Sequence, residues 1–409
     1  MSGATRTPDT MSRTVFPPVT EADWRAAAER LLKGRPLESL LRETADGIAR
    51  GPLFHAGNAM GGTALPSTDA PLLEGRPWHI LAPVRDPDLA HANAQLLQDL
   101  AGGASAVRIC ADDGEVPLRR AADLRRLLEG VYTTIIPLSF SPNARSADVA
   151  GYALELDELR SAHVHLGLDP LAHDAPNDLP DTWRPWTLAP RRAHEAGATE
   201  AEELSHLATM LAESCRWHGA EAVAGGTIVE IATTQDAHLS VAKLRAARRI
   251  TRRILEAFGV STMPLFHAVT SKRIMQSVDP WTNLLRVMSA GFGAVVGGAD
   301  AVLTRPFTDG SGLATPFAHR IARNMQLLMM EESDLGRAKD AAQGSYWHEA
   351  MTEELAQAAW ALFRRYERMG GVNALPSSYT EREAGPIVGV TLHPKPNDVP
   401  MPETREVET

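Results

Sequence analysis

The sequence contains only two cysteines in 409 residues, Cys110 and Cys215, which are far apart in the chain. So few cysteines exclude a disulfide-stabilised secreted scaffold, and their spacing does not match a zinc motif. No run of about 18 apolar residues occurs, so the sequence predicts no membrane-spanning helix. The N-terminal residues also lack the apolar core of a secretory signal peptide. We therefore expect a cytoplasmic protein without a membrane partner.

Basic residues are outnumbered by acidic ones. The sequence has 41 Lys and Arg residues against 51 Asp and Glu residues, which gives a net charge of −10. A chain without a cationic surplus is poorly suited to neutralise phosphates, so we expect no nucleic-acid partner. One basic run, residues 245–254, offers a possible contact for a phosphate. We interpret it instead as the solvated face of a helix.

Glycine-rich phosphate loops are also absent. Neither G-x-G-x-x-G after the first predicted strand nor G-x-x-x-x-G-K-[ST] occurs, which argues against a doubly wound nucleotide-binding sheet. From residue 75 onward, short β-prone segments alternate with helical segments. The β-prone segments are 77–84, 105–111, 132–140, 162–168, 185–193, 225–234, 264–271 and 300–307. Eight such units predict an α/β protein with a closed (β/α)8 TIM barrel.

The predicted helices complete the domain organisation. They cover residues 21–32, 87–100, 118–130, 199–218, 237–258, 280–296, 315–331 and 346–369. Residues 1–74 are predicted to form an extended N-terminal arm and linker, with the linker proper at residues 57–71. Residues 75–371 form the barrel with its C-terminal helices. Residues 372–409 form a polar, proline-rich tail.

The active site of such a barrel forms at the carboxyl ends of its strands. The predicted strand ends are rich in arginine and small polar groups and poor in paired carboxylates. His194 and His267 are the best candidates there for a proton carrier, although a single histidine is more often structural. His163 and His165 alternate along one strand and so share a face. No third ligand has a matching spacing, so we expect no metal site.

Several segments resemble the barrel domain of the methylmalonyl-CoA mutase family. They are DPWTNLLRVMSAGFGAVVGGAD at 279–300, AKLRAARRI at 242–250 and the long block from 317 to 371, which is the most specific. FPPVTEADWRAAAERLLKG, at 16–34, resembles the start of the family's small subunit. The resemblance covers residues 16–388. It implies an acyl-CoA barrel that works with a cobalamin domain in isomerising methylmalonyl-CoA to succinyl-CoA.

The cobalamin signature of the family is not matched in full. Its Asp-x-His-x-x-Gly motif includes the histidine that ligates cobalt. The nearest match, residues 236–241, ends in valine and lies within a predicted barrel helix, so we interpret it as chance. The chain ends where the linker to that domain would begin. We expect no cobalamin-binding domain and no bound cofactor here, with adenosylcobalamin carried by a partner subunit.

The substrate-contacting positions also differ from those of catalytic members. A Tyr-His pair corresponds to Arg191 and Arg192, and an arginine and a tyrosine of the first strand correspond to Leu81 and Pro83. Proline supplies no phenol, and leucine cannot hold a carboxylate. We therefore expect no catalytic residue. The degenerate former site comprises Leu81, Pro83, Arg191, Arg192, Gly226, Ile228 and Arg305, and Arg76, His194 and His267 remain as possible ligand contacts.

Bacterial members of the family can pair a catalytic large subunit with a non-catalytic small subunit. The resemblance thus implies a small subunit that stabilises a catalytic partner in a heterodimer, although a homodimer is also possible. One alternative is an active acyl-CoA mutase barrel that acts with a separate cobalamin-binding subunit. Another is a CoA-ester-binding protein without radical chemistry. In that protein Arg191, Arg192 and Arg305 would hold a phosphate or carboxylate, unless they pair with acids such as Glu195.

Overall fold

The structure is a computed structural model that describes residues 19–55, 76–110, 116–143, 145–379, 387–394 and 402–405. It divides into two compact units, Met1–Leu53 and Phe54–Thr409. The predicted linker at 57–71 lies outside the described residues, as do residues 380–386, 395–401 and 406–409 of the predicted tail.

The first unit contains the predicted N-terminal helix. Helix α1 (Glu21–Leu32) begins with a capping box, in which Thr20 Oγ1 accepts from the backbone N–H of Asp23 and the Asp23 carboxylate accepts from that of Thr20. The helix ends at Lys33, which has a left-handed backbone conformation. Strands β1 (Arg42–Glu43) and β2 (Ala49–Arg50) follow as a short antiparallel pair. The predicted helix at 21–32 is confirmed.

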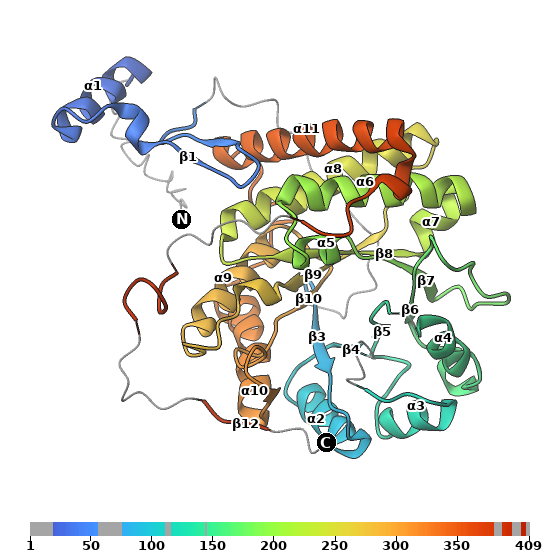
Figure 1. The fold of residues 1–409 in the computed structure, drawn as a ribbon. Coiled ribbons are helices and arrows are strands. Elements are labelled where there is room, and N and C mark those ends of the chain that lie inside the picture. Colours follow the sequence, from blue (N-terminus) through green and yellow to red (C-terminus); the bar gives the residue numbers. More distant parts are fainter. Residues whose placement is uncertain are drawn as a thin grey trace, which may run out of the picture. The chain divides into compact units, whose positions relative to one another are not determined.

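Eight parallel strands of the second unit close into a barrel in the order β10-β3-β4-β5-β6-β7-β8-β9 (Figure 1). Their bounds are β3 (His79–Val84), β4 (Ala106–Ile109), β5 (Leu138–Phe140), β6 (Val164–Leu168), β7 (Trp183–Leu188), β8 (Thr227–Thr233), β9 (Leu265–Thr270) and β10 (Ala301–Leu303). Each strand overlaps one of the eight predicted segments, so the predicted (β/α)8 barrel is confirmed. A further short pair, β11 (Leu313–Ala314) and β12 (Thr404–Arg405), is antiparallel.

Helices cover the outside of the barrel (Figure 1). They are α2 (Leu89–Ala101), α3 (Ala121–Leu127), α4 (Ser146–Leu154), α5 (Arg191–Glu195), α6 (Glu200–His218), α7 (Ala220–Gly226), α8 (Ala237–Ala257), α9 (Asn283–Val296) and α10 (Pro316–Leu327). Helix α11 (Tyr346–Met369) packs on α6 and α8. The sequence pattern does not predict α4, α5 and α7, which are too short to display a clear helical period.

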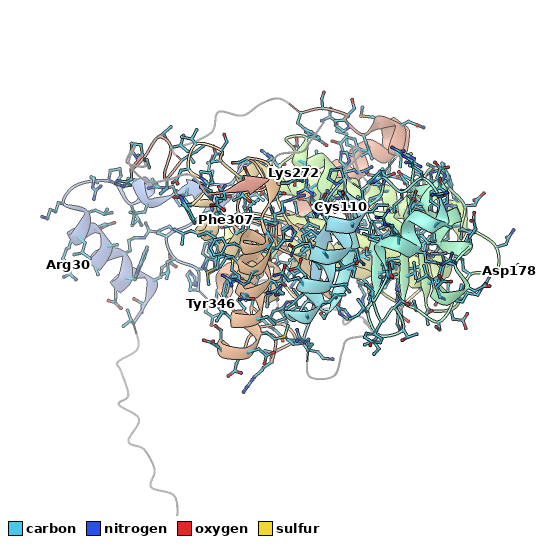
Figure 2. All side chains as sticks on the ribbon, turned by 90° about the horizontal axis from the view of Figure 1, so that it is seen from below. Arg30, Cys110, Asp178, Lys272, Phe307 and Tyr346 are labelled. Carbon is cyan, nitrogen blue, oxygen red and sulfur yellow. The ribbon has the colours of Figure 1, made fainter. Side chains whose placement is uncertain are left out.

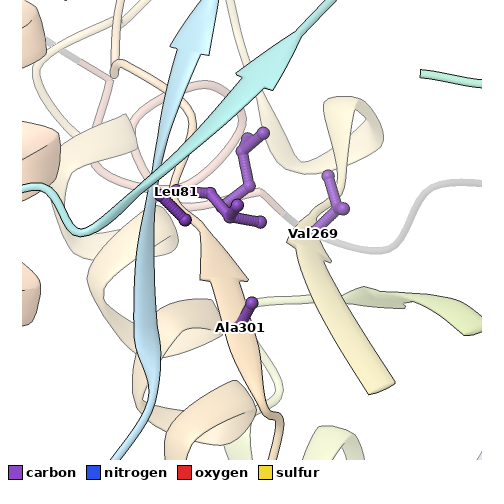
Figure 3. Close-up of a cluster of buried hydrophobic side chains, with 5 residues drawn as sticks. Leu81, Val269 and Ala301 are labelled. Carbon is purple, nitrogen blue, oxygen red and sulfur yellow. The ribbon is translucent and has the colours of Figure 1, made fainter. Parts of the chain in front are cut away.

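One side of the barrel interior is apolar. Leu81, Ala106, Val269, Ala301 and Leu303 form a buried cluster contributed by β3, β4, β9 and β10. Figure 3 shows Leu81, Val269 and Ala301 lying together inside the barrel. Leu81, predicted to belong to a degenerate substrate site, is therefore part of the hydrophobic core.

The interpretation of residues 245–254 as a solvated helix face is wrong. Arg245 and Arg248 of α8 are 0% and 4% exposed. Arg245 Nη2 lies 2.7 Å from a Glu349 oxygen of α11 and 2.9 Å from an Asp340 oxygen. The periodicity of α8 alone could not reveal this arrangement, because the carboxylates come from a segment about 100 residues further along the chain. Buried guanidinium groups require such partners.

Gly167 of β6 has a φ of +71°, and a Cβ there would lie 2.5 Å from Phe140 O. We expect Gly167→Ala to lower the free energy of unfolding by about 1–3 kcal/mol or more, because it adds a steric clash to left-handed strain. The matched control is Gly151→Ala in α4, where a Cβ meets nothing within 4 Å. That variant should gain about 0.5–1 kcal/mol. Urea denaturation measures both, and similar changes in the two variants would contradict the β6 geometry.

Candidate functional site at the barrel mouth

The carboxyl ends of the strands surround a small cavity of about 50 Å³. Five cationic side chains line it, together with Pro83 and Cys110: Arg85, Arg108, Arg191, Lys272 and Arg305. Lys272 and Cys110 are labelled in Figure 2. This is the position at which TIM-barrel enzymes bind substrate. We refer to it as the barrel mouth.

The first feature of the barrel mouth is a buried ion-pair group on Glu230 of β8. Glu230 Oε2 accepts from Arg191 Nε at 2.6 Å, and Oε1 forms an ion pair with Arg108 Nη2 of β4. Arg108 also donates to Ser139 Oγ at 2.8 Å. Burial alone would raise the pKa of Glu230, but Arg108 and Arg191 outweigh it and hold that pKa below its ordinary value. Protein side chains thus occupy the axis of the barrel below the mouth.

A second carboxylate, Asp309, joins Arg85 and Arg305. Arg305 Nη1 lies 3.0 Å from Asp309 Oδ2, and its Nε donates to Thr270 O at 2.8 Å. Arg85 Nη1 pairs with the other Asp309 oxygen. Burial acts to raise the pKa of Asp309, but the two arginines hold it below its ordinary value. Neither Arg191 nor Arg305 uses Glu195, whose carboxylate instead accepts from Lys272 N and Ser271 Oγ.

Two histidines lie deeper in the barrel. His165 and His267 are 5% and 3% exposed, and their ring centroids are 5.6 Å apart. Burial lowers the pKa of both imidazoles well below 6.5, so they are neutral at neutral pH. His267 precedes Val269, a residue of the barrel mouth, by two positions on β9. It therefore lies about 6–7 Å further from the strand ends. A proton carrier at that depth is remote from the mouth cavity.

His194 of α5 belongs to a polar network that also includes Ser271, after β9, and Glu203 of α6. Its Nε2 lies 3.1 Å from Ser271 Oγ, and its Nδ1 lies 3.7 Å from Glu203 Oε2. This order of groups resembles a Ser-His-Glu triad. Ser271 is 0% exposed, however, and its hydroxyl donates to Glu195 at 3.2 Å. Since the serine is inaccessible to a substrate, the network is structural.

The other candidate residues are dispersed. Arg76 donates to Gly103 O at 3.0 Å, near the amino ends of β3 and β4. Gly226 ends α7 and Ile228 lies near the start of β8, so both are also at the amino end of the barrel. Arg192 donates to Pro142 O and lines a separate cavity. The structure therefore brings together only Pro83, Arg191 and Arg305 of the predicted former site.

Three cationic side chains of the barrel mouth are not among the residues that the sequence pattern predicts: Arg85, Arg108 and Lys272. Arg108 lies in the middle of a strand whose residues are all buried. A charged residue at such a position requires a buried partner, and this is the signal that could have identified it. Arg85 directly follows β3, and Lys272 is the second residue after the end of β9, where the strands deliver side chains to the mouth.

The described residues contain no group of three or more His, Cys, Asp or Glu side chains placed to hold a metal ion. The partial match to the cobalt-ligating signature begins α8, where Asp236 Oδ1 caps the helix by accepting from Leu239 N at 3.1 Å. His238 Nδ1 lies 3.1 Å from His348 Nε2. The partial match thus lies within a barrel helix, with its aspartate in a helix cap and its histidine against α11. In the part of the chain that the structure describes, no helix is long and apolar enough to cross a bilayer.

The buried histidines predict acid sensitivity. Burial lowers the pKa of His206 from 6.5 to about 4 and that of His165, His194 and His267 well below 6.5. As the pH falls below about 6.5, these histidines bind protons in the unfolded chain but not in the folded chain. The free energy of unfolding therefore falls by up to about 1.4 kcal/mol per pH unit for each such histidine. We expect the urea midpoint to drop steeply between pH about 6.5 and about 4. A constant midpoint over that window would contradict neutral burial of these rings.

Residues 177–385, just over half of the chain, match the family model described as methylmalonyl-CoA mutase. The methylmalonyl-CoA mutase small subunit of Streptomyces virginiae is 33% identical, over 87% of this chain and 65% of the relative. The small subunit of Propionibacterium freudenreichii subsp. shermanii is 31% identical, over 90% of this chain and 65% of the relative. The methylmalonyl-CoA mutase of Rhizobium meliloti is 27% identical, over 93% of this chain and 65% of the relative. The chain thus spans about two thirds of the length of these relatives.

Proposed function

The chain belongs to the methylmalonyl-CoA mutase family, and we propose that it acts as a non-catalytic small subunit. In this role it pairs with a catalytic large subunit and stabilises it, while the partner isomerises methylmalonyl-CoA. Similarity to relatives named small subunit, at 31% and 33% identity over most of this chain, supports the assignment.

The observation that carries the proposal is the closed barrel axis. Pockets for cofactors and small substrates usually measure about 300–1,000 Å³. The barrel mouth has about 50 Å³, and the ion pairs of Glu230 with Arg108 and Arg191 occupy the axis beneath it. Opening a channel for a thioester would separate these buried charges, which is costly. The barrel is therefore suited to a structural role.

The chemistry of the mouth supports the same role. Acid–base catalysis needs a proton carrier within reach of the substrate. His267 lies deeper on β9, His194 is tied to Ser271, and Pro83 offers no ionisable group. Arginines remain protonated at neutral pH and do not exchange protons. At Pro83, Arg191 and Arg192, an active barrel that borrows cobalamin from another subunit would need the tyrosine and histidine side chains of catalytic members. Lys272 and Cys110 of the mouth stand at none of these positions.

Adenosylcobalamin, in this proposal, is bound by the partner. When bound, the cofactor supplies the radical chemistry of the family, and the protein around it positions the substrate and shields it. The partial match to the cobalt-ligating signature lies at the start of a barrel helix, where Asp236 caps α8 and His238 contacts His348. This placement supports a cofactor site in the partner, and in this proposal the barrel contributes no step that involves the cofactor.

Helix α9 presents an apolar stripe suited to a partner. Leu285, Met288 and Phe292 are 69%, 43% and 38% exposed, and their spacing places them on one face of the helix. The outward face of a barrel helix is ordinarily polar. An exposed apolar stripe of this kind supports pairing through the barrel helices.

A restoration experiment tests the absence of catalysis. The double variant Pro83→Tyr and Arg192→His restores two residue types of catalytic members. We expect the isolated double variant to show no mutase turnover with added adenosylcobalamin, because the axis remains closed by Glu230 and its arginines. A catalytic mutase assayed in parallel provides the positive control. Turnover by the isolated variant would overturn the non-catalytic role.

A further inference from the structure

A second cavity, of about 300 Å³, lies beside the barrel axis between α5, α6 and the segment Val372–Tyr379. We call it the side pocket. Its floor comes from the end of β7, including Thr187 and Ala189, and its roof includes Leu375 and Tyr379. Tyr379 Oη is hydrogen-bonded to His206 Nε2 of α6, which fixes the roof in place. The volume falls in the range of small-molecule sites.

The side pocket contains an unsatisfied buried hydroxyl. Thr187 is 1% exposed and lines the cavity, and its Oγ1 has no hydrogen-bond partner among the described residues. A buried polar group without a partner is costly, so native proteins rarely leave one without a function or an additional partner. A ligand in the side pocket would satisfy this hydroxyl.

Two charged groups also line the side pocket. The Arg192 guanidinium lines the cavity, and in the described part of the chain its hydrogen bonding is limited to Pro142 O. Most of its donors therefore remain available, in a fork that matches a carboxylate. Asp169 lines the same cavity, and one of its oxygens accepts from Leu171 N at 2.9 Å. The other oxygen can accept from an amino or hydroxyl group.

Besides His206, Ser377 and Tyr379, most of the remaining lining is aliphatic. Ala189, Ala193, Met210 and Leu375 provide apolar surface around Thr187, Arg192 and Asp169. At about 30 Å³ for each non-hydrogen atom, as in liquid water, the volume holds roughly ten such atoms. This is the size of a short aliphatic chain with a polar head.

We propose that the side pocket binds a small aliphatic acid that carries an amino or hydroxyl group. Arg192 holds the carboxylate, Asp169 accepts from the amino or hydroxyl group, and Thr187 supplies a further hydrogen bond. The aliphatic part packs on Met210 and Leu375. The site lies outside the barrel axis, so this binding proposal does not depend on the proposed small-subunit role.

The test is calorimetric titration of the full chain with four matched probes. L-leucine and 2-hydroxyisocaproate carry the complete set of groups, 4-methylpentanoate lacks the amino or hydroxyl group, and isoamylamine lacks the carboxylate. We expect saturable binding of one or both complete acids. The acid that binds more tightly shows whether the ligand's second polar group is an amino or a hydroxyl group. Isoamylamine should bind at least about tenfold more weakly, since it forgoes a charge-assisted hydrogen bond. No saturable binding of either complete acid, or equal binding of isoamylamine, would overturn the proposal.

Two variants locate the binding. Arg192→Ala removes the carboxylate partner and should weaken binding of the complete acid about tenfold or more. Thr187→Val removes the hydroxyl with little change in shape and should weaken it by several-fold. Arg125→Ala, at an exposed arginine of α3, is the matched control. Unchanged affinity in both site variants, with their fold verified by circular dichroism, would place binding elsewhere and contradict the proposal.

Discussion

Replacing Lys243 by methionine is expected to lower the free energy of unfolding by about 3–5 kcal/mol. Lys243 Nζ of α8 lies 2.7 Å from Glu203 Oε2 of α6, and the two side chains are 1% and 0% exposed. Burial already raises the pKa of Glu203, while the ammonium and the backbone N–H of Ala232 oppose this shift. Without Lys243 the buried Glu203 carboxylate loses its cationic partner. The folded protein must then either keep an uncompensated charge on Glu203 or bind a proton there.

Urea denaturation of four variants measures this effect. Lys339→Met, at an exposed lysine, is the control and should stay within about 0.5 kcal/mol of the parent chain. The double variant Lys243→Met and Glu203→Gln should lose less than the sum of the two single variants, because neither then leaves an uncompensated charge. Additive losses would show that the two groups are not coupled.

Glu230→Gln is expected to lower the free energy of unfolding by a similar amount, about 3–5 kcal/mol. The carboxylate compensates two guanidinium groups, those of Arg108 and Arg191, whose side chains are 3% and 11% exposed. A neutral amide cannot balance either charge. The barrel axis should then admit water to solvate the arginines, with a visible loss of thermal stability.

A triple variant provides the control for Glu230. The substitutions Arg108→Met, Arg191→Met and Glu230→Met remove all three charges together and fill a similar volume. Replacement of a buried ion-pair group by apolar residues is often neutral or stabilising. We expect the triple variant to be markedly more stable than Glu230→Gln. If Glu230→Gln alone were neutral, the ion pairs would not close the barrel as described.

Most of the barrel was predictable from local pattern. Strand β8, Thr227–Thr233, lies inside the predicted segment 225–234, and α11 has the predicted bounds. Both elements carry long, unambiguous patterns of apolar residues. The five residues of α5 were instead expected to end a strand or follow it, because a single helical turn has no period to detect. The length of strand β5 was overestimated, because the β-branched residues before Leu138 indicate a strand but form turns.

The site was less predictable than the fold. Position at a strand end sufficed to select Arg191 and Arg305, but not to identify Glu230 and Asp309 as their partners. Arg191 and Arg192 were expected to act together. Consecutive residues of a helix point about 100° apart, so α5 directs one arginine to the barrel mouth and the other to the side pocket. Such divergence depends on a helix that the sequence did not reveal.

The central claim is that this barrel supports catalysis without performing it. The most direct measurement is a mutase assay on the tagged chain isolated from its own cell extract, with adenosylcobalamin added and its partners identified by mass spectrometry. We predict recovery of a large barrel-plus-cobalamin subunit at equal stoichiometry, with activity in the complex and none in the isolated chain. Recovery of only a small cobalamin-binding protein, with full activity, would show that this barrel performs the chemistry and would contradict the claim.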